Sequence, residues 1–317
     1  MKEHYHSPTM ADWTGRYDGT QTDYFYQTIE PMILTSPPSE KLSGYALLGF
    51  ACDLGVVRNQ GRAGAKEGPQ AIKQALAKLP AIHAHSIYDA GDIVADESGL
   101  QVAQTALGNA VCCLLDRGLF PIVLGGGHET AFGHYQGLMK HSGNQAIHIV
   151  NIDAHFDLRP IPDDQIGHSG TSFKQIAEHC KLIKQTFNYY CIGIQSVSNT
   201  ASLFETAKAL GVHTLPAEQI FLQGSASVED FLKPVINSPL PVYLSICLDA
   251  FAACYAPGVS SPQPLGIFPW HIIPALKKLV ASGNIIAMDM VELAPCFDKD
   301  GLTAKLAAQL LWNLLYY

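Results

Sequence analysis

From Tyr45 to the C-terminus, apolar segments of strand length alternate with segments of helical periodicity, and this alternation limits the possible folds more than any other feature. Strands separated by helices form parallel sheets, because each right-handed crossover returns the chain in the same direction. The sequence therefore predicts an α/β protein with three layers, α-β-α, around a central parallel sheet of about eight strands.

The chain is predicted to form one domain. No linker, change of composition or internal repeat divides residues 1–317, and the hydrophobic content of 48% supplies a large core. Residues 1–40 are aromatic and polar with scattered prolines, which indicates an irregular N-terminal arm or lid. A loop rich in glycine and arginine is expected from Val57 to Gly68.

Charge and composition argue against several classes of partner. The net charge of −8 is modest and spread out, so we expect neither a nucleic-acid nor a membrane partner. No apolar run approaches the ~20 residues of a membrane span, and the N-terminus is not signal-like. The eight cysteines show no CxxC spacing, and several lie in apolar segments. Free thiols of this kind are typical of a reducing compartment, so the sequence predicts a cytoplasmic protein.

Polar and ionisable residues gather directly after four apolar strands. Such segments are ligand sites in parallel sheets, whose strands end at one common edge. The four segments are Gly125–Glu129, Asp153–Arg159, Ser245–Gly258 and Asp289–Pro295.

The second of these segments is the hardest to explain as structure alone. Asp153, His155 and Asp157 alternate at a strand end, so their side chains can converge on one point. Burying two carboxylates with an imidazole is costly unless a cation pairs them, which favours a metal site. His128, taken by itself, would be read as a packed or capping histidine. The glycines before it fit neither GxGxxG nor a phosphate-binding loop.

These motifs together resemble the arginase/agmatinase ureohydrolase family. The matching residues are Gly125-Gly-Gly-His128, Asp153-Ala-His-Phe-Asp157 and Leu248-Asp249 followed by Ala256-Pro-Gly258, and the resemblance covers Tyr45 to the C-terminus. The chain most resembles the branch that releases formamide and glutamate from N-formimidoyl-L-glutamate in histidine degradation. That branch is favoured by Arg58–Gly64, Ser169–Phe173, Gly193–Thr200, Ala256–Pro262 and Met288–Glu292.

The resemblance implies a site for two Mn²⁺ ions per chain. His128 and Asp157 match ligands of one ion, His155 and Asp249 match ligands of the other, and Asp153 matches a bridging carboxylate. The sixth position differs, because most members have Asp-x-Asp where this chain has Cys247-Leu-Asp249. A thiolate is a soft donor, so a softer metal or a single occupied position is an alternative to two Mn²⁺.

The resemblance also implies a mechanism, in which a hydroxide shared by the two metals attacks the amidine carbon. Glu292 matches the residue that accepts hydrogen bonds from the amidinium, and Asp157 is expected to carry the proton to the leaving nitrogen. Arg159 stands where arginases carry an Asn that contacts the substrate, and its guanidinium suits a carboxylate. Arg58 and Arg62 are either a second carboxylate clamp or solvated loop residues.

Ser169 is expected among the substrate-binding residues. It stands where arginases carry a His proton shuttle, but a hydroxyl cannot shuttle protons near neutral pH, so protonation of the leaving group would depend on Asp157 or water. His168, its neighbour, is a possible replacement. The alternatives to this function are another amidine or guanidine hydrolase, of agmatinase, guanidinobutyrase or arginase type, and a catalytically silent binding protein with the same fold. We expect a small-molecule substrate as partner, with a homo-oligomer implied only by the resemblance.

Overall fold

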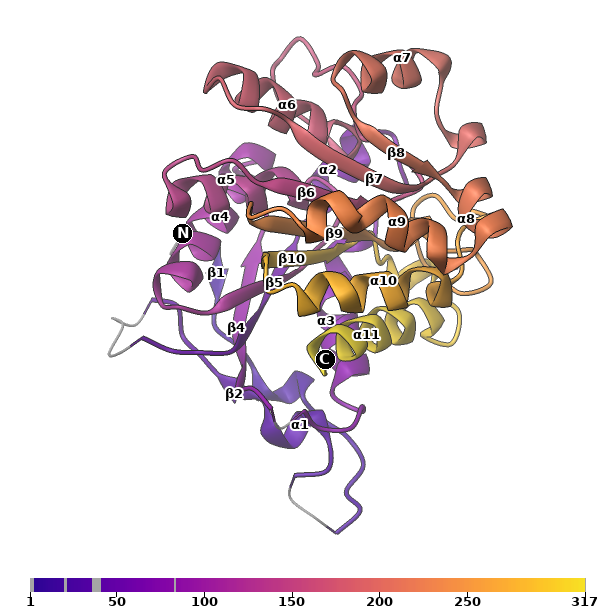
Figure 1. Ribbon diagram of the computed structural model, residues 1–317. Coiled ribbons are helices and arrows are strands. Elements are labelled where there is room, and N and C mark those ends of the chain that lie inside the picture. The colour runs from indigo at the N-terminus through magenta and orange to yellow at the C-terminus, as the bar shows by residue number, and fades with distance from the viewer. Residues whose placement is uncertain (1–2, 20–21, 36–40, 83, 317) are drawn as a thin grey trace.

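A ten-stranded sheet forms the middle layer of the computed structural model, which describes residues 3–19, 22–35, 41–82 and 84–316 (Figure 1). Its strand order is β1-β4-β3-β5-β10-β9-β6-β7-β8, with β2 beside β4. The eight strands β3 to β10 all pair in parallel. They are β3 (Tyr45–Ala51), β4 (Ile87–Val94), β5 (Phe120–Leu124), β6 (His148–Ile152), β7 (Asn188–Ile194), β8 (His213–Pro216), β9 (Val242–Cys247) and β10 (Ile285–Val291).

Helices cover both faces of this sheet, each over its own hydrophobic cluster. One face is covered by α4 (Leu100–Asp116), α5 (Thr130–Ser142), α6 (Ser172–Leu182) and α7 (Ala201–Ala209). The other is covered by α3 (Gly68–Leu76), α8 (Ala217–Gln223), α9 (Ser225–Ile236), α10 (Pro269–Ala281) and α11 (Leu302–Leu315). Among the described residues, no helix has the length and apolar character that crossing a membrane requires.

The predicted fold class is confirmed, including the eight parallel strands of the central sheet. Three short helices are not predicted by the sequence pattern: α1 (Phe25–Thr28), α2 (Leu54–Arg58) and α8. Helix α2 has only five residues and contains Gly55, so it offers too few turns for a periodic signal. Its end, Arg58, was expected to lie in a loop.

The N-terminal segment packs against the sheet edge. β1 (Tyr5–His6) pairs antiparallel with β4, and β2 (Glu30–Pro31) pairs parallel with it; α1 (Phe25–Thr28) lies between them in the chain. Trp13 is buried and donates a hydrogen bond from Nε1 to Asp89 Oδ2 (2.7 Å). Part of the segment expected to be an irregular arm is therefore integrated into the edge of the sheet, while residues 1–2, 20–21 and 36–40 lie outside the described residues.

A buried ion pair holds this edge together. The Lys73 side chain, on α3, is 1% exposed, and its Nζ lies 2.9 Å from Asp89 Oδ1 and 3.0 Å from Asp92 Oδ1. Buried charges of this kind are tolerated because each has a partner of opposite sign. The same Asp89 carboxylate accepts from Trp13, so one ion pair connects α3, β4 and the N-terminal segment.

Replacing Lys73 by Met is predicted to lower the free energy of unfolding by about 3 to 5 kcal/mol, because Asp89 would remain buried without a cation. Urea denaturation followed by circular dichroism measures the change. Lys78→Met is the matched control, since Lys78 is exposed just beyond α3 and should change stability by no more than about 0.5 kcal/mol. Equal effects of the two substitutions would contradict the structural role of the ion pair.

Candidate metal centre

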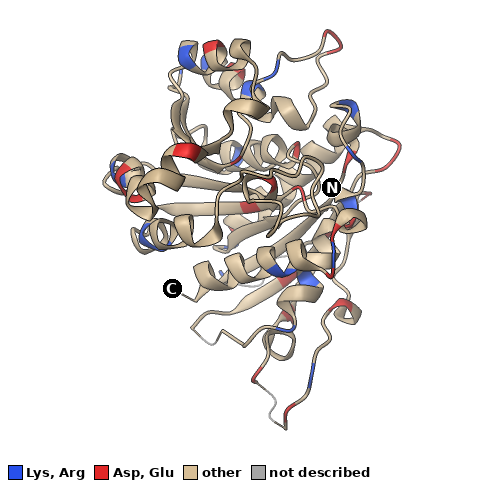
Figure 2. Ribbon diagram, turned by 90° about the vertical axis from the view of Figure 1, so that its right-hand side faces the viewer, with Lys and Arg blue, Asp and Glu red and all other residues tan. Residues whose placement is uncertain are grey.

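Four neighbouring strands end at the candidate site. β5, β10, β9 and β6 are adjacent in the sheet, and their carboxyl ends lead to His128, Glu292, Asp249 and Asp153. Acidic positions accordingly occur in the middle of the fold as well as on its outer helices (Figure 2). The chain can turn tightly after β5 because Gly126 has no side chain: a Cβ there would lie 1.6 Å from the carbonyl oxygen of Cys52.

Two sets of metal-capable side chains meet at this edge, and they share Asp153. His128, Asp153 and Cys247 form one set, and Asp153, His155 and Asp249 form the other. Within each set the donor atoms all lie within 4.8 Å of one another. Asp157 joins the first set, since its Oδ2 lies 2.9 Å from His128 Nδ1. The six residues predicted as ligands are thus brought together, with Asp153 between two positions.

The His128 ring shows that a cation fits here. Its Nδ1 is buried, lies 3.0 Å from Asp153 Oδ2 and 2.9 Å from Asp157 Oδ2, and yet has no hydrogen-bond partner. Its Nε2 lies 3.0 Å from Ser245 Oγ, which in turn donates to Asp289 Oδ1 (2.6 Å). Because the Ser245 proton goes to Asp289, Ser245 accepts from Nε2–H, and Nδ1 is the ring atom that faces the two carboxylates. Burial lowers the pKa of His128, but Asp153 and Asp157 outweigh burial and raise that pKa. The position therefore stabilises positive charge, and a metal ion would take the place of the Nδ1 proton.

Hydrogen bonds beneath the site hold the ligands in place. Tyr243 donates its O–H to Asp289, and His134 Nδ1 lies 2.9 Å from the same carboxylate. Asn151 Nδ2 donates to Asp153 Oδ2 (3.0 Å) and to Tyr189 Oη (2.9 Å). Such supporting contacts fix the orientation of metal ligands and raise affinity.

Burial and the charges of neighbouring residues shift the pKa values of the predicted ligands. Burial acts to raise the pKa of Asp153, but its contacts with His128 and His155 outweigh burial and lower that pKa. Burial, followed by the charge of Asp153, raises the pKa of Asp157. Burial and then the charge of Asp249 raise the pKa of the Cys247 thiol. A bound cation would relieve these repulsions and favour the deprotonated ligands.

A cavity of about 300 Å³ lies above the ligands. Glu292, 5% exposed, lines it and accepts a hydrogen bond from the backbone N–H of His128 through Oε1 (2.8 Å). Burial, then the charges of Glu129 and Asp249, raise the pKa of Glu292. Both Glu292 (φ 74°) and Asp157 (φ 49°) have left-handed backbone, which is uncommon outside glycine and concentrates at functional sites.

The predicted substrate-contacting residues differ in the hydrogen bonds that their side chains make. Arg159 lines the cavity, is exposed, and its side chain makes no hydrogen bond or ion pair among the described residues. Ser169 also lines the cavity and accepts from Asn59 Nδ2 (3.0 Å). Arg62 lines it too, but its guanidinium donates to the carbonyls of Ser260 (2.9 Å) and Val259 (2.5 Å), so it ties two loops together.

Arg58 lies apart from the cavity lining, so the structure adds no support to its expected role as a second carboxylate clamp. Its guanidinium donates to Asp164 Oδ2 (2.7 Å) and to the carbonyl oxygens of Ile166 and Gly167, and it is absent from the cavity lining. The structure therefore gives it a role in joining α2 to the loop before Ser169. His168 also lies outside the lining, and its Nδ1 accepts from the backbone N–H of Gly170 (3.2 Å). The described residues of the N-terminal segment contribute nothing to the lining, so its predicted role as a lid finds no support there.

Several residues of the site were not singled out by sequence reasoning. Asn199 holds the ligand loop, because it donates to the carbonyl of Ala154 (2.9 Å) and accepts from the N–H of Phe156 (3.1 Å). Asn151 on β6 and Ser245 on β9 stand two residues before Asp153 and Cys247, and this spacing is the available signal. Glu129 is fully buried, and burial raises its pKa to about 7.

Comparisons with known proteins agree with this geometry. A model of the arginase family matches residues 43–316. The chain is 43% identical over 311 residues to formimidoylglutamase of Legionella pneumophila (strain Paris), covering 98% of this chain and 97% of that relative. The crystal structure of Trypanosoma cruzi formiminoglutamase with Mn²⁺ superimposes with a TM-score of 0.76 at 26% identity, over 89% of this chain and 96% of the other.

The chain belongs to the arginase family. Formimidoylglutamase from Bacillus subtilis shares the fold, with a TM-score of 0.82 at 21% identity over 95% of this chain and 93% of that one. The Legionella relative carries the name formimidoylglutamase, and the Trypanosoma structure carries the name formiminoglutamase.

Ser245→Ala is predicted to weaken metal binding by about tenfold or more, because the His128 ring loses the contact that fixes its tautomer. Calorimetric titration of the metal-free protein with Mn²⁺ measures this. Ser227→Ala serves as the control, since Ser227 is a buried serine of α9 whose Oγ donates to the carbonyl of Gly224 (2.7 Å). An affinity of the Ser245 variant equal to that of the control would show that the contact does not position the ligand.

Proposed function

We propose that the chain is a metal-dependent hydrolase that cleaves the formimidoyl group of N-formimidoyl-L-glutamate, giving L-glutamate and formamide in histidine degradation. The observation that carries this proposal is the cavity itself. Two ligand sets sharing Asp153 lie at its base, and the unpaired guanidinium of Arg159 faces it. The names of the relatives compared above support the same reaction.

The metal ions of the proposal are two Mn²⁺. His128, Asp153, Asp157 and Cys247 would hold one, and Asp153, His155 and Asp249 the other. Carboxylate oxygens and imidazole nitrogens suit Mn²⁺, whereas the Cys247 thiolate favours a softer ion. When bound, the metals would supply a water acidic enough to ionise near neutral pH. The Mn²⁺ of the Trypanosoma relative supports this assignment.

The side chains around the cavity have separate roles in the proposed reaction. Glu292 accepts hydrogen bonds from the amidinium and holds its planar carbon over the ligands, and the cation in turn favours the ionised carboxylate. Asp157, 12% exposed at the cavity wall, takes a proton from the attacking water and returns it to the leaving nitrogen of glutamate. Breaking the C–N bond then leaves glutamate as a neutral amine, which is protonated in water.

Arg159 supports the choice of substrate. N-formimidoyl-glutamate carries two carboxylates, and a guanidinium binds a carboxylate through two parallel hydrogen bonds. Agmatine is itself a cation without a carboxylate, so an unpaired arginine at the cavity disfavours it. The positive charge of Arg159 therefore favours N-formimidoyl-glutamate over agmatine as the substrate.

Arg159→Ala is predicted to raise KM for N-formimidoyl-glutamate at least tenfold with a smaller change in kcat, because the lost contact binds the part of the substrate that does not react. Release of glutamate and formamide by the Mn²⁺-loaded enzyme measures both constants, with arginine and agmatine as comparison substrates. Arg58→Ala is the matched control, since its guanidinium lies outside the cavity lining. Unchanged KM in the Arg159 variant would remove the carboxylate clamp, and faster turnover of agmatine or arginine would overturn the substrate.

Cys247→Asp is predicted to increase retention of Mn²⁺ during dialysis by about tenfold, because a carboxylate replaces a soft donor beside hard ions. Metal analysis of the dialysed protein gives the result. Cys191→Ser is the control, because Cys191 is also a fully buried strand cysteine but belongs to neither ligand set. Equal Mn²⁺ content in wild type and Cys247→Asp would exclude Cys247 as a ligand.

A reducing compartment suits this protein, so we also propose a cytoplasmic location. All eight cysteines are free, and Cys247 must stay reduced to contribute to the metal centre. The partner required by the proposal is the small-molecule substrate. Association between copies of the chain and the single-domain organisation remain predictions.

A further inference from the structure

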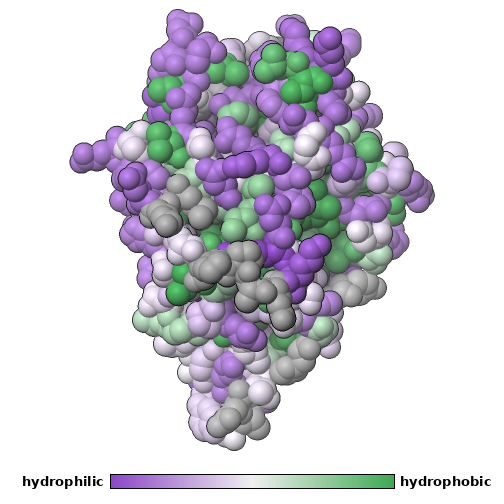
Figure 3. All heavy atoms as spheres, turned by 90° about the vertical axis from the view of Figure 1, so that its left-hand side faces the viewer, coloured by the Kyte–Doolittle hydropathy of each residue, from purple (hydrophilic) through white to green (hydrophobic). Residues whose placement is uncertain are grey.

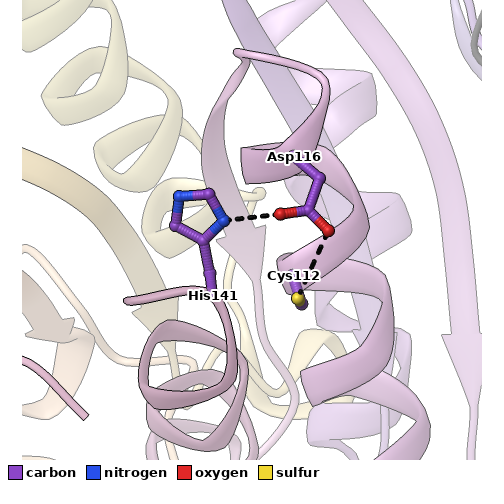
Figure 4. Close-up of side chains that lie close together, drawn as sticks. All are labelled: Cys112, Asp116 and His141. Atoms are coloured by element: carbon purple, nitrogen blue, oxygen red, sulfur yellow. Dashed lines mark hydrogen bonds and ion pairs between the residues drawn. The ribbon is translucent and has the colours of Figure 1, made fainter. Parts of the chain in front are cut away.

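A third group of metal-capable side chains lies away from the cavity. Among the described residues, three groups bring together side chains that suit a metal ion, and two of them share Asp153. The remaining group consists of Cys112 and Asp116 on α4 and His141 on α5 (Figure 4). Between Thr130, next to the metal centre, and His141 the helix rises about 16 Å, so the two sites are separate.

We propose that Cys112, Asp116 and His141 form a second metal site, which binds Zn²⁺ with water in the fourth position. Sulfur, nitrogen and oxygen donors together are typical of zinc and not of Mg²⁺ or Ca²⁺. Three protein ligands leave one position of a tetrahedral zinc site open to water.

The distances within the group fit this ion. Cys112 Sγ lies 3.6 Å from Asp116 Oδ2, and His141 Nδ1 lies 2.6 Å from Asp116 Oδ1. The three donor atoms are all within 4.8 Å of one another. Ligand bonds of 2.0 to 2.3 Å at tetrahedral angles separate donors by about 3.3 to 3.7 Å. Zinc binding therefore requires that the His141–Asp116 hydrogen bond open slightly, and it displaces both the proton of that hydrogen bond and the proton that the Cys112 thiol donates to Asp116, which pass to water.

Close packing of α4 and α5 prepares the ligands. Gly108, Gly133 and Gly137 let the helices approach: a Cβ on Gly137 would lie 2.6 Å from the Gly108 carbonyl oxygen. Cys112 and Asp116 are four residues apart and therefore lie on the same face of α4. Because the two helices hold the three side chains before any metal arrives, little further ordering is needed on binding.

Backbone electrostatics also favour a cation at this place. Asp116 is the last residue of α4, and His141 is the second-to-last residue of α5. Both helices thus bring their carboxyl ends to the group, and the carbonyls there carry partial negative charge. Lys140 lies nearby, but its Nζ donates to Asn109 Oδ1 (2.6 Å), about two turns before Asp116.

Solvent reaches two of the three ligands. The side chains of Asp116 and His141 are 62% and 38% exposed, while Cys112 is 8% exposed. The side of the molecule where α4 and α5 lie faces the viewer in Figure 3, and hydrophilic side chains are spread over it. Zinc can therefore enter through the aspartate and histidine and reach the thiolate behind them.

The test uses the full chain loaded with Mn²⁺, so that the first site is filled. Equilibrium dialysis against Zn²⁺, followed by metal analysis, should find one more zinc per chain in the wild type than in His141→Gln, or an affinity at least tenfold lower in that variant. Cobalt replaces zinc as a spectroscopic probe, and Cys112→Ser should lose a sulfur-to-cobalt absorption band that the wild type shows.

Cys113→Ser is the matched control, because Cys113 is the next residue of α4 and belongs to no ligand group. It should bind zinc and cobalt as the wild type does. His141 is exposed, so His141→Gln tests the site even where Cys112→Ser fails to fold. Equal zinc binding by wild type and His141→Gln, or equal loss in the Cys113 variant, would overturn the proposal.

Discussion

The arrangement of the site depends on the cost of burying several acidic groups in one place. Asp153 is fully buried and lies beside Asp157, Asp249 and Cys247 at the end of a parallel sheet. Desolvation of the carboxylates and repulsion between them oppose this arrangement, and His128 and His155 offset only part of that cost. Cations held between these side chains, as proposed above, would resolve the conflict at the point where His128 Nδ1 faces Asp153 and Asp157. The chemistry proposed for the chain follows from the same requirement.

The surrounding fold holds this costly arrangement in position. Four adjacent parallel strands place their carboxyl ends together, and neighbouring strand positions carry the supporting groups. Ser245 and Asp289 orient His128, and Asn151 orients Asp153. Because these contacts come from residues inside the sheet, the proposed ligands are supported by the rigid layer, whereas Arg159 and Ser169, which line the cavity, come from the segment between β6 and α6.

The order of strands and polar segments explains how much of the site could be predicted from sequence. Residues that follow two strands of a parallel sheet lie at one edge, which brings Asp153 to Asp157 near Cys247 and Asp249. Because β6 ends at Ile152 and β9 at Cys247, the final orientation of the side chains depends on the backbone beyond the strands, including the left-handed φ of 49° at Asp157, and strand alternation does not predict it. The ion pair between Arg58 and Asp164 could not be predicted in this way, because Asp164 lies 106 residues further along the chain. Helix α2 was missed because five residues carry no periodic signal, and the docking of Trp13 on Asp89 depends on a contact across 76 residues.

The central claim is that two metal positions share the Asp153 carboxylate. Crystals of the wild-type protein grown with Mn²⁺ and measured for anomalous scattering test it most directly. The account predicts two anomalous peaks per chain at this edge of the sheet, one within bonding distance of Asp153 and His128 and the other within bonding distance of Asp153 and Asp249. A single peak there, or none near Asp153, would contradict it.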